Sequence, residues 1–308
     1  MRTDVTFTSA GITIAGHLYT PDGATSAPLP GVVVSHPASG VKEQAAGVYA
    51  QHLADAGFVA LTFDAAHQGE SGGTPRGIED PAQRVEDFKC AVSFLTTRPE
   101  VDPDRIGALG VCASGGYVVP TAVSDHRIKA VATVSAVDVG LAHLVGADGT
   151  QDPAVIQGAL DAAAAARTAE AAGAPPRMVP IFPATEEEAR AGGRHVFDGW
   201  EYYCTDRGQH PRSAKEFTLT SVDRTVGFDA FHLIDLIAPR PLLMIVGTEA
   251  VTAWMSERAL EKAREPKRLH RIEGATHVDL YDRRVPEAVA ELVPFFTGHL
   301  AVSEPTAA

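Results

Sequence analysis

Short apolar runs alternate with stretches of helical periodicity along most of the chain. Residues 4–20 alternate apolar and polar positions and end at a Pro-Asp-Gly turn, which predicts an opening antiparallel hairpin. Apolar, β-branched runs predict buried strands at 31–36, 58–64, 105–111, 128–134, 241–247 and 267–272. Helical spacing predicts helices at 43–56, 80–98, 113–124, 253–264 and 285–300. Because strands and helices alternate, the sequence predicts an α/β fold, a mostly parallel sheet with helices on both faces.

The alternation stops after residue 138 and resumes at about residue 231. Between these points an Ala-rich run at 158–172 predicts a helix, and the residues after it lack strand alternation. We therefore expect a core formed by 1–138 and 231–308, interrupted by a helical lid at 139–230.

Composition and charge narrow the functional class. The chain has 308 residues, 45% of them hydrophobic and 21% charged, which suits one large α/β domain. A formal net charge of −13 would repel a phosphate backbone, so nucleic-acid binding is not expected. The apolar runs are too short for a membrane helix, and the first residues lack a signal-peptide stretch, so a cytoplasmic protein is expected. Three widely spaced cysteines argue against a disulfide framework or a cysteine-rich metal site, and no cofactor is expected.

A candidate nucleophile lies between a predicted strand and a predicted helix. Residues 110–116 read Gly-Val-Cys-Ala-Ser-Gly-Gly. A nucleophile elbow needs small residues two positions before and two positions after the nucleophile, and Gly110 and Ser114 meet this need around Cys112. The helix N-terminus favours the thiolate, and the backbone N–H of Ala113 is expected to be an oxyanion donor.

Two other interpretations of this segment remain open. Ser114 is an alternative nucleophile flanked by Cys112 and Gly116, although cysteine is bulkier than glycine at the tight position. Alternatively, the glycines only allow the helix and the strand to pack closely, and Cys112 is a buried, inert thiol.

The candidate base is His277, in the loop that follows the last predicted strand. That loop belongs to the same carboxyl edge of the sheet as the elbow, where a base must lie. The acid that orients the base is open between Asp138, after the strand at 128–134, and Glu249, after the strand at 241–247. A third alternative is a dyad held by the backbone.

A second oxyanion donor is expected in the loop that follows Ser35. The residues there are His36-Pro37-Ala38, and proline has no N–H, so the donor is expected to be Ala38. The alternative is a simple turn between a strand and a helix.

Together these segments resemble the α/β-hydrolase superfamily, in its dienelactone hydrolase-like branch, over nearly the whole chain. The resemblance rests on four segments: the His36-Pro37 loop, the Gly-rich loop 69–73, the elbow 110–116 and the loop 274–277. Dienelactone hydrolases also carry cysteine at the elbow, which favours Cys112. The branch usually has an aspartate three residues after a glycine in the loop after the penultimate strand, where this chain has Ala250.

The resemblance implies hydrolysis of an ester, lactone or thioester of a small metabolite through a cysteine acyl-enzyme, with His277 as base. The lid is longer than in the compact members of the branch, so their substrate is not carried over. Trp200, Tyr202 and Tyr203 are expected to line the substrate pocket, or to be ordinary lid core, and exposed aromatics there would support a homodimer. The alternatives are an acyltransferase, cyclase or lyase on the same scaffold, and a non-catalytic binding protein.

Overall fold

An eight-stranded sheet forms the centre of the protein, in the order β1-β2-β4-β3-β5-β6-β9-β10. The computed structural model describes residues 1–23 and 27–301. The strands β1 and β2 form the predicted hairpin, β2 pairs antiparallel with β4, and the remaining pairs are parallel, which confirms the predicted fold class. The strands are β1 (Arg2–Ser9), β2 (Ile12–Tyr19), β3 (Leu29–Ser35), β4 (Val59–Phe63), β5 (Val101–Val111), β6 (Ile128–Val134), β9 (Leu242–Gly247) and β10 (Lys267–Ile272).

Helices cover both faces of this sheet. The helices α1 (Ala45–Asp55) and α10 (Val285–His299) share one apolar core, and α2 (Pro81–Thr96), α3 (Ala113–Ser124) and α9 (Ala253–Lys262) share the other. Successive side chains of a strand point to opposite faces. Accordingly, Val32 and Val34 belong to the first core and Val33 to the second, which explains why the central strands are continuously apolar.

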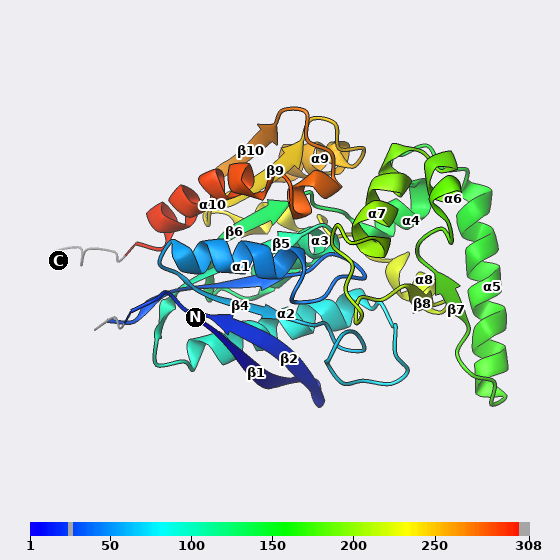
Figure 1. The fold of residues 1–308 in the computed structure, drawn as a ribbon, viewed down its shortest axis with the longest axis horizontal. Helices are drawn as coiled ribbons and strands as arrows, with labels where there is room; N and C mark the ends of the chain where they lie inside the picture. The colour runs from blue at the N-terminus through cyan, green and yellow to red at the C-terminus, as the bar shows by residue number, and fades with distance from the viewer. Residues whose placement is uncertain (24–26, 302–308) are drawn as a thin grey trace.

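The segment expected to form the lid lies at one end of the sheet, with α5 as its outermost element (Figure 1). Its elements are α4 (Val139–Val145), α5 (Pro153–Ala171), β7 (Met178–Pro180), α6 (Glu186–Ala191), α7 (Arg194–Cys204), β8 (Glu216–Thr218) and α8 (Ser221–Thr225). The pairing of β7 with β8 was not predicted, because strands of three residues show no alternation. The helix α5 begins earlier than expected, at Pro153, where the Asp152 side chain accepts the N–H of Ala154.

Two 3-10 helices, η1 (Ile234–Ile237) and η2 (Val278–Tyr281), lie in the returning part of the core. The side chains of Ile234 and Ile237 belong to the same apolar cluster as Val33, so the chain packs against the central sheet again at these residues. Within the described ranges, no helix has both the length and the apolar character needed to cross a membrane.

Candidate active site

The turn between β5 and α3 holds Cys112 in an unusual backbone conformation. Its φ is 57° and its ψ is −119°, a region that L-residues other than glycine rarely adopt. A Cβ on Gly110 would lie 2.0 Å from the carbonyl oxygen of Ser114, so only glycine fits there. The observed turn has the form of a nucleophile elbow, which presents its residue at the carboxyl edge of the sheet.

Ser114 lies beneath this turn and has no exposed surface. Its Oγ donates to the carbonyl oxygen of His36 at 2.5 Å, lies 2.9 Å from Ser35 Oγ and accepts from Arg84 Nη2 at 3.1 Å. The Ser114 hydroxyl thus hydrogen-bonds to buried groups of the protein itself. The geometry therefore gives Ser114 a structural role, whereas Cys112 is partly exposed towards a cavity.

Two backbone N–H groups converge beside the Cys112 sulfur. The N–H groups of Ala113 and Ala38, the two expected oxyanion donors, both lie beside the thiol and act to lower its pKa. The lid supports the loop that carries Ala38, since Tyr203 Oη donates to the Ala38 carbonyl at 3.3 Å and Ser213 Oγ donates to that of Ser39 at 2.8 Å. An oxyanion formed beside the sulfur would meet both donors.

The imidazole of His277 is buried between two hydroxyl groups. Its Nδ1 lies 2.6 Å from Thr252 Oγ1, and its Nε2 lies 2.9 Å from the hydroxyl of Tyr281. The Tyr281 hydroxyl also lies next to the Cys112 thiol and acts to lower its pKa. Hydrogen bonds therefore join Tyr281, His277 and Thr252, and Cys112 lies beside the Tyr281 end of this row.

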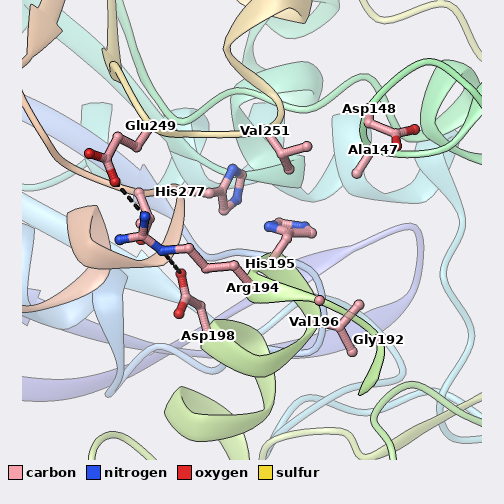
Figure 2. A pocket seen from close by; sticks show the side chains of 12 residues that line it. Ala147, Asp148, Gly192, Arg194, His195, Val196, Asp198, Glu249, Val251 and His277 are labelled. Carbon is pink, nitrogen blue, oxygen red and sulfur yellow. Dashed lines mark hydrogen bonds and ion pairs between the residues drawn. The ribbon is translucent and has the colours of Figure 1, made fainter. Parts of the chain in front are cut away.

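The two carboxylates expected to orient the base have other partners. Asp138 accepts the backbone N–H of Leu141 and of Ala230, both at 3.1 Å, and so begins α4. Glu249 turns outwards to Arg194 of the lid, 2.5 Å away (Figure 2). Among the described residues, neither carboxylate hydrogen-bonds to His277.

The hydroxyl of Thr252 lies beside Nδ1 of His277, where a carboxylate was expected. Thr252 lies five residues after Gly247, two positions beyond the site at which the branch usually has aspartate, and its Oγ1 faces Nδ1 of His277. Neither Thr252 nor Tyr281 was predicted. A threonine in a loop carries no signal of its own, but a tyrosine four residues after the candidate base could have been considered.

Burial favours the neutral forms of Cys112 and His277. It raises the pKa of the Cys112 thiol above that of an ordinary cysteine, in spite of the N–H and O–H groups beside it. It also lowers the pKa of His277 to about 3, with a smaller contribution from His195. The helix N-terminus was expected to favour the thiolate, but the pKa of the thiol is raised, and loss of solvation is the largest cause.

A cavity of about 300 Å³ lies in front of Cys112. Tyr203 and Phe182 form one wall, with ring centroids 4.9 Å apart and planes 26° from parallel. Of the other predicted pocket residues, Trp200 stacks on Phe197 and Tyr202 packs edge-on against Tyr203, and neither is among the residues that line the cavity. The remaining apolar lining comes from Ala38, Val137, Ala142, Ala147, Ile181, Pro183, Val196 and Val278.

A second cavity, of about 390 Å³, lies on the other side of His277. It is more polar, and Arg194 crosses it from α7 to Glu249 (Figure 2). His195 lines both cavities, and its ring centroid lies 5.4 Å from that of His277 with the planes 87° apart. Burial lowers the pKa of His195. The lid thus places a second imidazole beside the predicted base.

A buried charge cluster connects the elbow with the Ala38 loop from below. Arg84 bonds to His36 through Nη1 and Nη2 and lies 3.4 Å from Glu79, which accepts the Tyr117 hydroxyl at 2.7 Å. Burial and the nearby guanidinium hold the pKa of His36 well below its usual value. This cluster stabilises the two loops that carry the oxyanion donors, and the sequence did not reveal it.

Two relatives are similar to this chain over most of its length. The crystal structure of PA2218 from Pseudomonas aeruginosa superimposes with a TM-score of 0.91 at 36% identity, over 97% of this chain and 94% of that one. YcjY from Escherichia coli K12 is 40% identical over 268 residues, which are 86% of this chain and 87% of that protein. Residues 14–161 match the model of the dienelactone hydrolase family. The chain belongs to the dienelactone hydrolase family.

Membership of the dienelactone hydrolase family confirms the resemblance seen in the sequence and supports a hydrolase-type function. The matched range contains the Ala38 loop and the elbow, while His277 lies beyond it, in the region also shared with PA2218. A protein named thiohydrolase from Eupenicillium brefeldianum is 26% identical over 303 residues, 96% of this chain and 93% of that protein.

Proposed function

We propose that this family member hydrolyses an ester, lactone or thioester of a small molecule through an acyl-enzyme on Cys112. One observation carries the proposal. The Cys112 sulfur sits at a strained elbow, has two backbone N–H groups beside it, opens to a cavity and lies next to the Tyr281 hydroxyl, which is hydrogen-bonded to His277.

In the proposed reaction His277 takes up the thiol proton, and the thiolate attacks the acyl carbon. The carbonyl oxygen becomes an oxyanion held by the N–H groups of Ala113 and Ala38. Collapse expels the alcohol or thiol, which receives the proton from His277. Water, activated by His277, then releases the acid. Because Cys112 and His277 are neutral at rest, this pair adds no charge to the buried site before substrate arrives.

The two cavities support different parts of such a substrate. The apolar wall of Phe182 and Tyr203 suits the acyl group, and the polar space beyond His277 suits the leaving group. A thioester substrate is further supported by the thiohydrolase relative. The proposed ligand is therefore a small acyl compound with an apolar acyl part.

Steady-state hydrolysis of a small activated ester tests this function. We expect Cys112→Ala and His277→Ala to lose nearly all turnover, because one removes the nucleophile and the other its base. Cys90→Ala is the matched control, since Cys90 is a partly exposed thiol of α2 outside the cavity. Turnover that survives in Cys112→Ala would contradict the proposal. Product analysis with an added alcohol or thiol acceptor separates hydrolysis from acyl transfer.

A further inference from the structure

We propose that Tyr281 is a catalytic residue that relays the Cys112 proton to His277. This inference rests on the proposed function and adds a group to it. The Tyr281 hydroxyl lies 2.9 Å from His277 Nε2 and next to the Cys112 thiol. It lines the same cavity as Cys112 and His277.

The ring of Tyr281 is held firmly in this position. It is 2% exposed and packs edge-on against Tyr202, with centroids 5.2 Å apart and planes 79° apart. Tyr203 packs against it from a second direction. The backbone contributes too, because η2 (Val278–Tyr281) directly follows His277. A hydroxyl fixed this way keeps both partners without needing to rotate.

Direct transfer from sulfur to imidazole is obstructed in this arrangement. Both ring nitrogens of His277 already have a partner, Thr252 at Nδ1 and Tyr281 at Nε2. A thiol proton could reach Nε2 directly only if the bond from Tyr281 were broken. The structure instead offers a continuous path through the phenol oxygen.

The relay balances without any further reactant. In the reacting tautomer, Nδ1–H donates to Thr252 Oγ1, the Tyr281 O–H donates to Nε2, and the Cys112 S–H donates to the phenol oxygen. The S–H bond breaks as the phenol oxygen takes its proton, and the phenol passes its own proton to Nε2. The products are a thiolate, an unchanged tyrosine and an imidazolium. When the tetrahedral intermediate collapses, the phenol donates its proton to the leaving-group oxygen or sulfur and takes up the proton held at Nε2, so His277 returns to the neutral form.

The test compares Tyr281→Phe with Tyr49→Phe, a matched loss of one buried phenol hydroxyl. Tyr49 Oη donates to the Leu280 carbonyl at 2.7 Å, behind the site. We expect Tyr281→Phe to lower kcat for an activated ester by about 100-fold or more, the size of a lost acid–base step, with little change in KM. Alkylation of Cys112 by iodoacetamide at pH 7.5, in a background lacking Cys90 and Cys204, should slow by about tenfold. Tyr49→Phe should stay close to wild type in both assays.

A proton inventory in mixtures of H₂O and D₂O gives a readout that needs no variant. Two protons move together in the relay, so the wild-type acylation rate should give a curved inventory. A linear inventory, or an unchanged or faster alkylation rate in folded Tyr281→Phe, would overturn the relay. If Cys112→Ala is inactive while Tyr281→Phe behaves as wild type, the relay fails and the proposed function stands. If Cys112→Ala stays active, the proposed function itself fails.

Discussion

At the scale of single residues, two hydroxyl groups hold the imidazole of His277 in place. The form of the elbow and the placement of Ala113 and Ala38 beside Cys112 could be predicted, because one short segment, 110–116, and one loop contain all that this arrangement requires. The partners of His277 could not. Thr252 and Tyr281 come from different loops, and their meeting with His277 depends on how β9, β10 and η2 are placed in space.

Replacing Thr252 tests whether its hydroxyl orients the imidazole of His277, the role usually assigned to a carboxylate. Thr252→Val keeps the shape but leaves the buried Nδ1 without a partner, at a cost of about 1–3 kcal/mol in unfolding free energy. We expect kcat to fall by about 10- to 100-fold with little change in KM, because the imidazole loses its tautomer and orientation. Thr252→Ser should keep most of the activity, and steady-state kinetics of both variants measure this. Equal activity in valine and serine variants would contradict this role.

The lowered pKa of His277 also predicts a dependence of stability on pH. The folded protein holds this imidazole neutral down to about pH 3, whereas the unfolded chain binds a proton near pH 6.5. Stability is therefore lost as the pH falls below about 6.5. Between pH 7.5 and 5.0 the loss from this group is about 2 kcal/mol in unfolding free energy.

Urea unfolding of wild type and His277→Gln at these two pH values measures that loss. The unfolding free energy of the variant should depend less on pH than that of wild type. Some dependence should remain, because burial also lowers the pKa values of His36 and His195. An identical pH dependence in both proteins would show that His277 titrates normally in the folded state.

At the scale of elements, the contact between lid and core explains why Glu249 is not beside the base. The loop after β9 directs Glu249 towards Arg194 at the start of α7, and Thr252 follows in the same loop on the inner side. The alternation of strands and helices could be predicted because each element has its own periodicity. The pairing of β7 with β8 and the position of α7 could not, since they depend on contacts between distant segments.

The ion pair between Arg194 and Glu249 predicts a mild effect of charge removal. Their side chains are 64% and 47% exposed, so solvent screens the pair, and Glu249→Gln should change the unfolding free energy by less than about 1 kcal/mol. We expect kcat to stay within about threefold of wild type, because Glu249 does not contact His277. A loss of about 1,000-fold or more in kcat would instead mark Glu249 as the catalytic acid.

At the scale of the whole molecule, the site is complete only where lid and core meet. The core provides Cys112 and His277, and the lid provides Phe182, Tyr203 and His195. The sequence predicted an α/β fold with an inserted segment, but the shape of the cavity depends on how that segment is seated. Tyr203 lines the cavity and Trp200 does not, a difference that residue type alone could not reveal.

This shared cavity predicts that the lid sets the length of the acyl group. Phe182→Trp would fill part of the 300 Å³ in front of Cys112. We expect kcat/KM for acetyl esters to remain near wild type and that for hexanoyl or octanoyl esters to fall by about tenfold, as a crowded apolar pocket excludes added methylenes. Rates for a series of p-nitrophenyl esters measure this. A uniform loss across the series would contradict an acyl-binding role for Phe182.

The central claim is that Cys112 carries the acyl group during turnover. Rapid acid quenching of the enzyme with an activated ester, followed by intact-mass analysis and peptide mapping, tests it most directly. We predict one added acyl mass on Cys112 in wild type and in Cys90→Ala, and none in Cys112→Ala. An adduct on Ser114 or another residue, or turnover with no adduct at Cys112, would contradict the account.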